Sequence, residues 1–418
     1  MRVGIIGAGA AGLTSAKHII QGGHDCEVLE LQEDLGGTWI YSDDVGADKY
    51  GFPIYSAMYQ NLRTNSPKEI MAFPDLAFPD KENSYLTQAE VLNYLHQYAD
   101  KFNLRPHIKF NRFVVEIKPL EGNRWIVRSI NKINKEEIED EYDAIMICNG
   151  IYNEPDYPTL EGIEKFTGLA THSHQFRSPK RYKGQRVIVM GAGPSGFDIT
   201  LNVSEVATKV IFSHHSTYDI KSKYPDNVEQ RCDIKKILNE NTVEFIDGSV
   251  EEIDAIIYCT GYLYSYPFLH ESCGITITEN YVQHLYKHLI NIKYPTMCLI
   301  GIPFNVCALQ MFDLQARFFT AYLDEKMKLP DFDQMLNDEK SDMEERIAKG
   351  YTKRKAHLMG VDQNAYYDML AKTAKLKPIP PVMTKLFLHC IQCLICDLMN
   401  FRDLKFKIID EENFIQIL

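Results

Sequence analysis

Two glycine-rich segments constrain the fold of this chain more than any other feature. The first is Gly7-Ala8-Gly9-Ala10-Ala11-Gly12, after the apolar run 3–6, and the second is Gly191-Ala192-Gly193-Pro194-Ser195-Gly196, after the apolar run 187–190. In a strand–turn–helix unit, the first glycine permits a tight turn and the second lets the backbone approach a pyrophosphate. The third lets the helix pack closely on the strand. Two such segments therefore predict two nucleotide-binding units on one chain.

A carboxylate follows the next strand of the first unit. The strand at 27–29 leads into Glu30, where an acidic residue accepts hydrogen bonds from the ribose hydroxyls of FAD or NAD. The helix N-terminus after each glycine segment presents unpaired N–H groups and a positive dipole end to phosphates. A glycine-rich turn without a ligand is the alternative for each segment, and the strand–turn–helix context of both segments disfavours it.

A second pair of similar segments supports the duplication. Residues 143–150 (DAIMICNG) resemble residues 254–261 (DAIIYCTG). Each has the continuous apolar pattern of a buried parallel strand, so each can return the chain to its sheet. A Pro-rich stretch at 155–158 marks the first crossing between units. We therefore expect an α/β fold in which one Rossmann-like dinucleotide-binding domain (153–262) is inserted into another (1–152 and 263–418, the latter with a C-terminal helical region).

Charge and cysteine usage exclude several classes of function. The formal net charge of −12 argues against nucleic acid as a partner and against general attraction to anionic membranes. The ten cysteines are scattered, and several lie in apolar strands, which is typical of free thiols in a reducing compartment. No charged-then-apolar leader precedes the first strand, so we expect a cytoplasmic protein. Secretion stays compatible with the sequence if a leader has been removed.

A CxxCxxC run at Cys390, Cys393 and Cys396 lies within the apolar stretch 386–399. A metal or iron–sulfur site would need a fourth ligand, and none has suggestive spacing. We interpret the cysteines as small apolar residues packed on a helix and predict no metal site. The stretch is too short and too interrupted by polar residues to cross a bilayer, so no transmembrane segment is expected. It is compatible with a membrane surface or with a subunit contact in a homo-oligomer.

Four further segments shape the expected architecture. Residues 36–80 show little periodicity over a long stretch, which is typical of a segment that lines a site. Residues 87–102 have the spacing of an amphipathic helix, with a capping box at Thr87 and Glu90. Helices are also predicted at 312–328 and, with a highly charged and solvated surface, at 338–355.

The segment between the two units resembles a family motif. Residues 166–176 read FTGLATHSHQF, which resembles the FxGxxxHxxx(Y/F) identifying motif of flavin-containing monooxygenases. Other segments are similar to further family patterns: Gly36-Gly37-Thr38-Trp39 to the GGxW turn, 61–69 to the flavin-side TNxPKE segment, 94–102 to the YLxxYAxxF helix, Thr260-Gly261-Tyr262 to the TGY turn, and Asp313-x-Gln315-x-Arg317 to the helix that returns to the flavin. The resemblance covers roughly residues 3–325 and looks closest to short insect members, whose known activities include N-oxygenation of pyrrolizidine alkaloids.

The resemblance implies an FAD- and NADPH-dependent monooxygenase. In that family NADPH reduces FAD, O2 adds at the flavin C4a to give a hydroperoxide, and a tertiary amine or sulfide substrate attacks the distal oxygen. The substrate brings its own lone pair, so no nucleophilic serine or cysteine is required. Detoxification of plant alkaloids would fit this chemistry. The alternatives are an NADPH oxidase or a reductase of disulfides or quinones, which would oxygenate nothing, and a nucleotide-binding redox sensor.

Site residues follow from the resemblance and from the glycine segments. FAD is expected at Gly7, Gly9, Ala10, Ala11, Gly12 and Glu30, with Gly37, Thr38, Trp39, Asn61, Thr64 and Gln315 beside it. NADPH is expected at Gly191, Gly193, Pro194, Ser195, Gly196, Ser213, His214, His215, Thr260 and Gly261. Asn65 is predicted to be the catalytic amide that positions the oxygen adduct or NADP⁺. Its alternative is a turn residue before Ser66-Pro67, and core packing is the alternative for Trp39.

Two departures from the family patterns refine this hypothesis. Ketone-oxygenating relatives carry Trp at the position of Phe176, followed by Pro or Asp, so Phe176-Arg177 makes ketone oxygenation less favoured. The strand at 210–212 leads to His214 and His215 where the family usually offers an arginine to the 2′-phosphate of NADPH. No acidic residue ends this strand, but neutral imidazoles hold phosphate more weakly than arginine. We expect a loose preference for NADPH over NADH, with Lys221 or Lys223 assisting.

Overall fold

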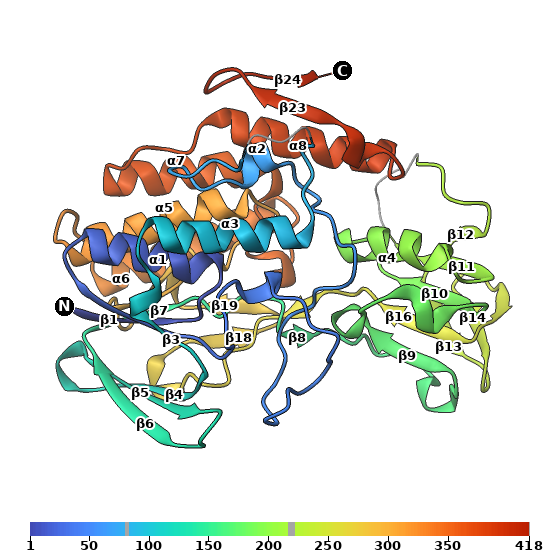
Figure 1. The fold of residues 1–418 in the computed structure, drawn as a ribbon, viewed down its shortest axis with the longest axis horizontal. Helices are drawn as coiled ribbons and strands as arrows, with labels where there is room; N and C mark the ends of the chain where they lie inside the picture. The colour runs from blue at the N-terminus through green and yellow to red at the C-terminus, as the bar shows by residue number, and fades with distance from the viewer. Residues whose placement is uncertain (80–82, 216–221, 418) are drawn as a thin grey trace.

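The computed structural model describes residues 1–79, 83–215 and 222–417, and its first feature is a seven-stranded sheet (Figure 1). The strands are β1 (Arg2–Ile6), β2 (Asp25–Leu29), β3 (Ile108–Lys109), β7 (Ala144–Ile147), β20 (Leu285–Tyr286), β21 (Ile290–Asn291) and β22 (Met297–Leu299). They lie in the order β20-β21-β22-β7-β1-β2-β3. The strands from β22 to β3 run parallel, and β20 and β21 add an antiparallel edge.

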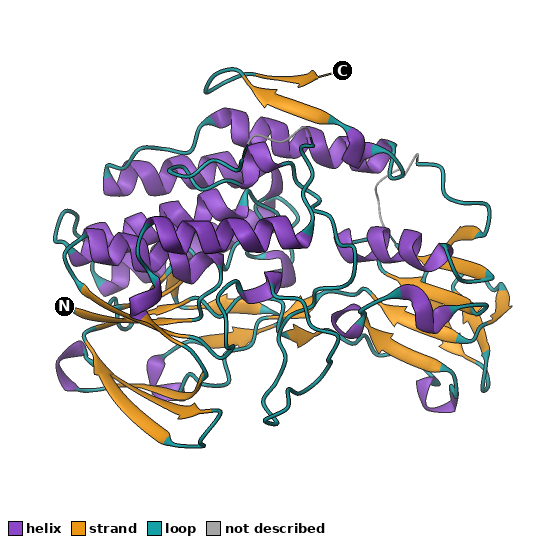
Figure 2. Ribbon diagram, viewed as in Figure 1, coloured by secondary structure: helices purple, strands orange, loops and turns teal. Residues whose placement is uncertain are grey.

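A second sheet lies beside the first and is parallel throughout (Figure 2). Its strands are β9 (Leu169–His172), β10 (Arg186–Met190), β11 (Lys209–Ser213), β12 (Val228–Arg231) and β16 (Ala255–Tyr258), in the order β12-β11-β10-β16-β9. β1 and β10 occupy equivalent positions, because each is followed by a glycine segment and pairs with the strand that comes next. The predicted α/β class with two dinucleotide-binding folds is confirmed.

Helices cover both sheets on one side. They are α1 (Ala10–Gln21), α2 (Lys68–Met71), α3 (Gln88–Lys101), α4 (Pro194–Ser204), α5 (Ala308–Leu323), α6 (Phe332–Ala348), α7 (Gln363–Ala374) and α8 (Pro381–Cys396). Side chains of α1, α3, α5 and α7 share one apolar core with the first sheet, whereas α4 lies over the second sheet (Figure 1). The predicted capping box of α3 is present, since Thr87 and Glu90 each accept from the other's backbone N–H.

Two of the expected helices have different bounds. α5 begins at Ala308, before the predicted start at 312, and the N–H of Cys307 at its N-cap donates to Gln363 and Tyr367. α6 begins at Phe332, before the predicted start at 338, because Asp331 forms a capping box with Gln334. The first start depends on tertiary contacts, and the second is set by a capping pair that sequence analysis missed.

Small antiparallel sheets cover the opposite faces. β4 (Arg112–Pro119), β5 (Trp125–Asn131) and β6 (Glu137–Tyr142) pack on the first sheet around the fully buried Trp125. β13 (Ile234–Ile237), β14 (Thr242–Phe245) and β15 (Val250–Glu252) share a core with the second sheet. There are also two hairpins, formed by β18 (Thr276–Thr278) with β19 (Tyr281–Gln283) and by β23 (Lys405–Ile408) with β24 (Phe414–Ile417).

The chain passes between the two sheets through one narrow ribbon. β8 (Glu154–Pro155) leaves the first unit and pairs antiparallel with β17 (Tyr262–Leu263), which returns to it, so that Tyr262 lies opposite Pro155. The ribbon is extended by a hydrogen bond of 3.0 Å from the Asp156 N–H to the Gly261 carbonyl. Every strand of the second sheet lies between β8 and β17 in the sequence. The exact domain limits at 152 and 262 remain a prediction.

The C-terminal segment packs on the second unit as well as the first. Side chains of α8 and of the following residues share an apolar core with Phe197 and Val203 of α4; they include Leu386, Phe387, Cys390, Phe401 and Phe406. In Figure 1 this red segment lies above both units and reaches across to α4. The sequence assigned these residues to the first domain, and their packing against the inserted unit is a finding of the structure.

The expected packing of the cysteine run on a helix holds for Cys390 and partly for Cys393, but not for Cys396. Cys390 is buried, Cys393 is half-buried and Cys396 is exposed, and all ten cysteines carry free thiols. Among the residues that the structure describes, no group of three or more histidine, cysteine or acidic side chains is arranged to hold a metal ion. Within the same ranges, every helix falls short of the length and apolar character needed to cross a membrane.

A buried charge cluster joins α1 to α5. Asp313 is 2% exposed and lies 2.6 Å from Nε2 of His18, 2.7 Å from Nε of Arg317 and 3.5 Å from Nζ of Lys17. Burial by itself would raise the pKa of the Asp313 carboxyl. The hydrogen bond from His18 and the charges of His18, Arg317 and Lys17 outweigh burial and hold that pKa well below its usual range.

We expect Asp313→Asn to destabilise the protein by about 3 kcal/mol at pH 7, because it removes the buried carboxylate that Lys17, His18 and Arg317 share. In the wild type, the unfolded carboxyl takes up a proton as the pH falls through about 3.9 while the folded one stays ionised. The contribution of Asp313 is therefore fully present above that pH and is lost below it. Urea unfolding at pH 7 and in steps from about pH 4.5 down to about pH 2.5 would measure both effects. Glu121→Gln, at an exposed carboxylate, is the control, and an unchanged pH profile in Asp313→Asn would contradict the expectation.

Candidate functional site

The first glycine segment is a turn with no room for side chains. Gly7 has φ +101°, and a Cβ there would lie 2.7 Å from the Cys148 carbonyl oxygen. A Cβ on Gly12 would lie 1.8 Å from the Gly7 carbonyl oxygen. α1 therefore packs directly on the turn, and its N-terminus stands at the carboxyl end of β1, where open α/β sheets bind their ligands.

The second glycine segment repeats this geometry. Gly191 has φ +108°, and a Cβ there would lie 2.6 Å from the Cys259 carbonyl oxygen, while a Cβ on Gly196 would lie 1.8 Å from the Gly191 carbonyl oxygen. Gly193 differs, because a Cβ there would meet no heavy atom of the described residues within 4 Å. The space above Gly193 thus fits the close approach of a pyrophosphate.

Both helices start with donors available for an anion. α1 begins after Gly9 and α4 after Gly193, and neither N-cap forms a side-chain capping bond with the described residues. The first turns also contain no acidic residue. The unpaired N–H groups and the positive end of each helix dipole therefore face the place where a pyrophosphate binds. The first positions of these turns are Ala10 and Ala11 in α1 and Pro194 and Ser195 in α4.

Glu30 lies beside the first glycine segment. Its two carboxylate oxygens accept from the N–H of Ala8 at 2.6 Å and from the N–H of Gln32 at 2.7 Å. Burial raises the pKa of the Glu30 carboxyl, against the opposing effects of these hydrogen bonds and of the Lys132 charge. Each oxygen keeps a second lone pair. Glu30 can therefore hold the turn in place and still accept from a ribose hydroxyl.

The GGxW turn is brought against the first glycine segment. The Gly36 N–H donates to the Ala8 carbonyl at 3.0 Å, and a Cβ on Gly37 would lie 2.9 Å from the Cα of Gly9. Thr38 is exposed and Trp39 half-buried in the short 3₁₀ turn Gly37–Trp39. Trp39 is partly buried and packs against the first core. Core packing, the alternative role for Trp39, therefore accounts for part of this side chain.

Of three further predicted FAD residues, one is exposed and two have other contacts in this structure. Asn61 is exposed in a turn at φ +61°. The Thr64 hydroxyl accepts from the Leu86 N–H at 3.0 Å. Gln315 is fully buried, with its oxygen accepting from the Gly301 N–H and its NH2 donating to the Tyr366 hydroxyl, both at 2.8 Å. Their contact with FAD remains a prediction.

Asn65 is joined to a residue that sequence analysis missed. Its Oδ1 accepts from Nη2 of Arg402 at 2.6 Å, and Nη1 of Arg402 donates to Asp198 of α4 at 2.7 Å. Asp198 also accepts from the Tyr59 hydroxyl. Arg402 lies in the C-terminal segment, more than 300 residues from Asn65, and no local pattern in the sequence signals this contact.

The family-like motif contains β9, the edge strand of the second sheet, and the 3₁₀ turn that follows it. His172, at the end of β9, is fully buried, and its ring meets Tyr157 and Tyr262 edge-on. Burial lowers the pKa of His172 to about 4. His172 and Phe176 also have structural contacts, because His172 accepts from the N–H of His174 at 3.1 Å and Phe176 packs on Tyr59.

Arg177, which follows the motif, ties the long irregular segment to it. Its guanidinium donates to the carbonyls of Asp44, Ser56 and His174 at distances of 2.8 to 3.2 Å. The part of this irregular segment that contains Asp44 and Ser56 is therefore held against the family-like motif. This position agrees with the expectation that it lines a site.

The end of β11 is more acidic than the sequence indicated. Ser213 is buried and donates to the Cys232 carbonyl, His214 contacts Gln230 at 3.2 Å, and His215 contacts the Asp233 carboxylate at 2.7 Å. No acidic residue ends the strand itself, yet the turn after β12 brings Asp233 to the predicted 2′-phosphate position. Lys223 is exposed, and Lys221 lies outside the described residues.

Thr260 and Gly261 lie where β16 gives way to the crossing ribbon. The Thr260 hydroxyl donates to the Asp156 carbonyl, and Gly261 has φ +91°. They stand beside Gly191, whose turn is closed by the neighbouring Cys259 carbonyl. The structure thus brings them together with the second glycine segment.

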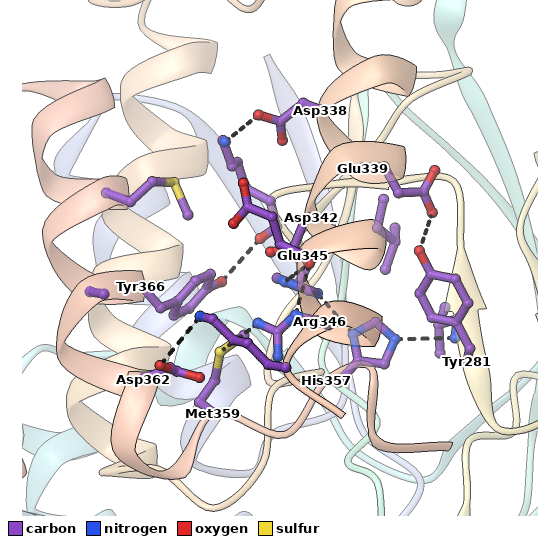
Figure 3. Close-up of a pocket in the computed structure, with 17 residues that line it drawn as sticks. Tyr281, Asp338, Glu339, Asp342, Glu345, Arg346, His357, Met359, Asp362 and Tyr366 are labelled. Carbon is purple, nitrogen blue, oxygen red and sulfur yellow. Dashed lines mark hydrogen bonds and ion pairs between the residues drawn. The ribbon is translucent and has the colours of Figure 1, made fainter. Parts of the chain in front are cut away.

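A polar cavity of about 260 Å³ lies elsewhere, between α6, α7 and β19 (Figure 3). Its charged groups pair with one another, as Arg346 does with Asp342 at 2.8 Å and Lys349 with Asp362 at 3.7 Å. His357 is held neutral because burial lowers its pKa. The cavity contains neither glycine segment, so it is not the dinucleotide site.

Comparison with known proteins agrees with this geometry. The family model described as flavin-binding monooxygenase-like matches residues 1–229 and 224–392. Senecionine N-oxygenase of Tyria jacobaeae is 32% identical over 99% of this chain and 91% of that protein. Flavin-containing monooxygenase FMO GS-OX4 of Arabidopsis thaliana is 35% identical over 88% of this chain and 83% of that protein. The solved structure of S-allyl-L-cysteine S-oxygenase from Allium sativum superposes with a TM-score of 0.90 at 31% identity, covering 96% of this chain and 94% of that chain.

Two alanine substitutions in the second glycine segment should separate binding from folding. Gly193→Ala adds a methyl group to open space at φ −88°, so we expect unfolding free energy within about 0.5 kcal/mol of wild type and a rise of at least tenfold in the dissociation constant for NADPH. Gly196→Ala forces Cβ onto the Gly191 carbonyl and should cost about 1–3 kcal/mol of stability. Denaturation and NADPH titration on both variants are the measurements. Unchanged NADPH affinity in Gly193→Ala would rule out this place for the pyrophosphate.

Proposed function

This chain belongs to the flavin-binding monooxygenase family, and from that membership we propose that it transfers one oxygen atom of O2 to the nitrogen of a tertiary amine. N- or S-oxygenation with FAD and NADPH is the chemistry of this family. The observation that carries the assignment is the pair of glycine turns, one at the carboxyl end of the parallel strand β1 and the other at that of β10. When bound, the flavin accepts a hydride from NADPH and activates O2.

The residues of the chain bind and orient the two nucleotides. The N-terminus of α1 would hold the FAD pyrophosphate and Glu30 the ribose, and the N-terminus of α4 would hold the NADPH pyrophosphate. The crossing ribbon keeps the two units adjacent, so that both nicotinamide and flavin can reach the segment at 59–65. The Gln60 N–H of this segment donates to the Arg177 carbonyl at 2.8 Å, and Arg402 donates to Asn65. Because the segment is held at both points, it can exclude water from the reacting atoms.

Asn65 is the proposed catalytic amide. An amide can donate and accept hydrogen bonds at once, which suits it to hold the nicotinamide and the oxygen to be transferred in one arrangement. Its oxygen already accepts from Arg402. The NH2 group is then the part of Asn65 available to a ligand.

The choice of an amine substrate rests on charge and on the relatives. The formal net charge of −12 raises the local concentration of cationic molecules, and a tertiary amine is mostly protonated in neutral solution before it binds as the free base. One relative is named for N-oxygenation of senecionine, so we propose pyrrolizidine alkaloids as the substrate class and their detoxification as the purpose. The sulfur compound named for another relative is the second candidate.

Parallel assays with senecionine and S-allyl-L-cysteine would test this proposal. Each assay follows NADPH oxidation, hydrogen peroxide release and oxygenated product by mass spectrometry. We expect senecionine N-oxide in proportion to NADPH consumed. NADPH oxidation that yields only peroxide with either compound would indicate an oxidase. Nucleotide binding without turnover would indicate a redox sensor.

We predict that Asn65→Ala lowers amine oxygenation by about 10²–10³-fold, the usual effect of losing one positioned donor, while reduction of the flavin by NADPH stays within about threefold of wild type. Hydride transfer needs only the two rings in contact, which the glycine turns provide. Asn65→Asp should be at least as damaging because it adds a charge and removes the donor. Rapid-mixing reduction and product formation on the same preparations are the measurements. Equal loss of both would show that Asn65 supports the fold or the flavin instead.

We predict that Asp233→Asn tightens NADPH binding by about tenfold, since it removes a negative charge from the predicted 2′-phosphate position. NADH lacks that phosphate and is the matched control, so its dissociation constant should not change. His215→Ala in the same assay should weaken NADPH alone. A change of equal size for NADH and NADPH would place the 2′-phosphate away from His215.

A further inference from the structure

Arg402 connects three parts of the chain that are far apart in sequence. Its guanidinium donates to Oδ1 of Asn65 at 2.6 Å, to the Thr64 carbonyl at 3.2 Å and to the Asp198 carboxylate at 2.7 Å. The side chain of Arg402 is 15% exposed and that of Asp198 is 8% exposed. The cluster therefore joins the segment at 59–65, helix α4 of the inserted unit and the C-terminal segment in one largely buried place.

The chemistry of the guanidinium decides how the Asn65 amide is turned. A guanidinium has five N–H donors and no acceptor. Only the oxygen of an amide can face it at hydrogen-bond distance, so the NH2 group of Asn65 must face the opposite way. Without this contact, the two amide orientations would be close in energy, and only one of them presents a donor to the ligand.

Arg402 is itself held on several sides. Arg63 donates to the Arg402 carbonyl at 3.0 Å, and the guanidinium lies 4.8 Å from the ring centroid of Phe401, which is buried in the core shared with α4. Asp198 in turn accepts from Tyr59, and burial, together with the Asp198 charge, raises the pKa of the Tyr59 hydroxyl well above its usual range. The phenol therefore remains a donor throughout the working pH range.

We propose that Arg402 is a positioning residue for oxygen transfer, which fixes the Asn65 amide with its NH2 group toward the bound dinucleotide and is itself aligned by Asp198 of α4. This inference rests on the proposed role of Asn65. It assigns a function to Arg402, which lies beyond the part of the chain that the family model matches, residues 1–392. The orientation of Arg402, and through it that of Asn65, then also depends on the position of the inserted unit, since Asp198 belongs to that unit.

Arg402→Met tests the proposal in the holoenzyme, with hydrogen peroxide released per NADPH oxidised as the main readout. We expect this ratio to rise to nearly that of Asn65→Ala, the dissociation constant of NADP⁺ to rise about tenfold, and flavin reduction to stay within about threefold of wild type. Arg402→Lys should recover part of the coupling, because an ammonium can donate to the amide oxygen but cannot bridge all three acceptors. If Arg402→Met leaves the buried Asp198 charge unstable, Arg402→Met with Asp198→Asn removes that charge.

Arg112→Met is the matched control. Arg112 is similarly shielded and pairs with Asp140 at 2.8 Å in the small sheet of the first unit, so its loss should lower stability without changing the peroxide ratio or NADP⁺ binding. A ratio in Arg402→Met equal to that of Arg112→Met would overturn the proposal. So would an additive effect of Arg402→Met in the Asn65→Ala background, because a residue that acts through Asn65 has little left to contribute there.

The same variants distinguish the role of Arg402 from the role of Asn65. If Asn65→Ala releases peroxide and Arg402→Met does not, the role of Arg402 is wrong and that of Asn65 survives. If Asn65→Ala leaves the ratio unchanged, both roles are wrong. A matching rise in both single variants, with no further rise in the double variant, supports the proposal.

Discussion

The close contact between a helix and the turn before it is the constraint on which both halves of this structure depend. In each unit the third glycine lies against the carbonyl of the first, where a Cβ would approach to 1.8 Å. The first glycine is in turn closed by the carbonyl that follows the returning strand, Cys148 in one unit and Cys259 in the other. In each unit the glycine segment therefore packs against the end of the returning strand, which explains why both are duplicated. This packing leaves the helix N-terminus open to an anion.

The two units are held together by a second, less regular set of contacts. The crossing ribbon supplies backbone pairing, the C-terminal segment supplies an apolar core with α4, and Arg402 supplies polar contacts between them. A largely buried ion pair such as Arg402–Asp198 contributes little net stability, because desolvation offsets most of the attraction. The ion pair instead restricts the geometry of the interface, since the planar donors of a guanidinium allow only a few positions for their partners. These polar contacts thus determine how the two units are arranged more than how strongly they are held together.

Local patterns in the sequence were sufficient for the repeated units and insufficient for contacts between distant segments. The glycine turns, the strand order around them and the capping box of α3 follow from short-range rules, and the structure contains them. The starts of α5 and α6 were predicted too late, because one depends on Gln363 and Tyr367 and the other on a capping pair at Asp331 and Gln334. Arg402 beside Asn65, and Asp233 beside His215, are brought together only by the folded chain. The contacts around Asn65 and His215 are therefore the part of the candidate site that local sequence patterns reveal least.

The route of the chain also determines the order in which the protein can assemble on the ribosome. β7 is made before the inserted unit, whereas its neighbour β22 is made after it. One edge of the central sheet therefore stays uncovered while more than a hundred residues are synthesised, and uncovered edges invite unwanted pairing. The inserted unit enters and leaves through adjacent strands, so it can fold first without help from the unfinished sheet. Completion of the larger unit then waits for β22 and α5, and the last residues to emerge are those that connect the two.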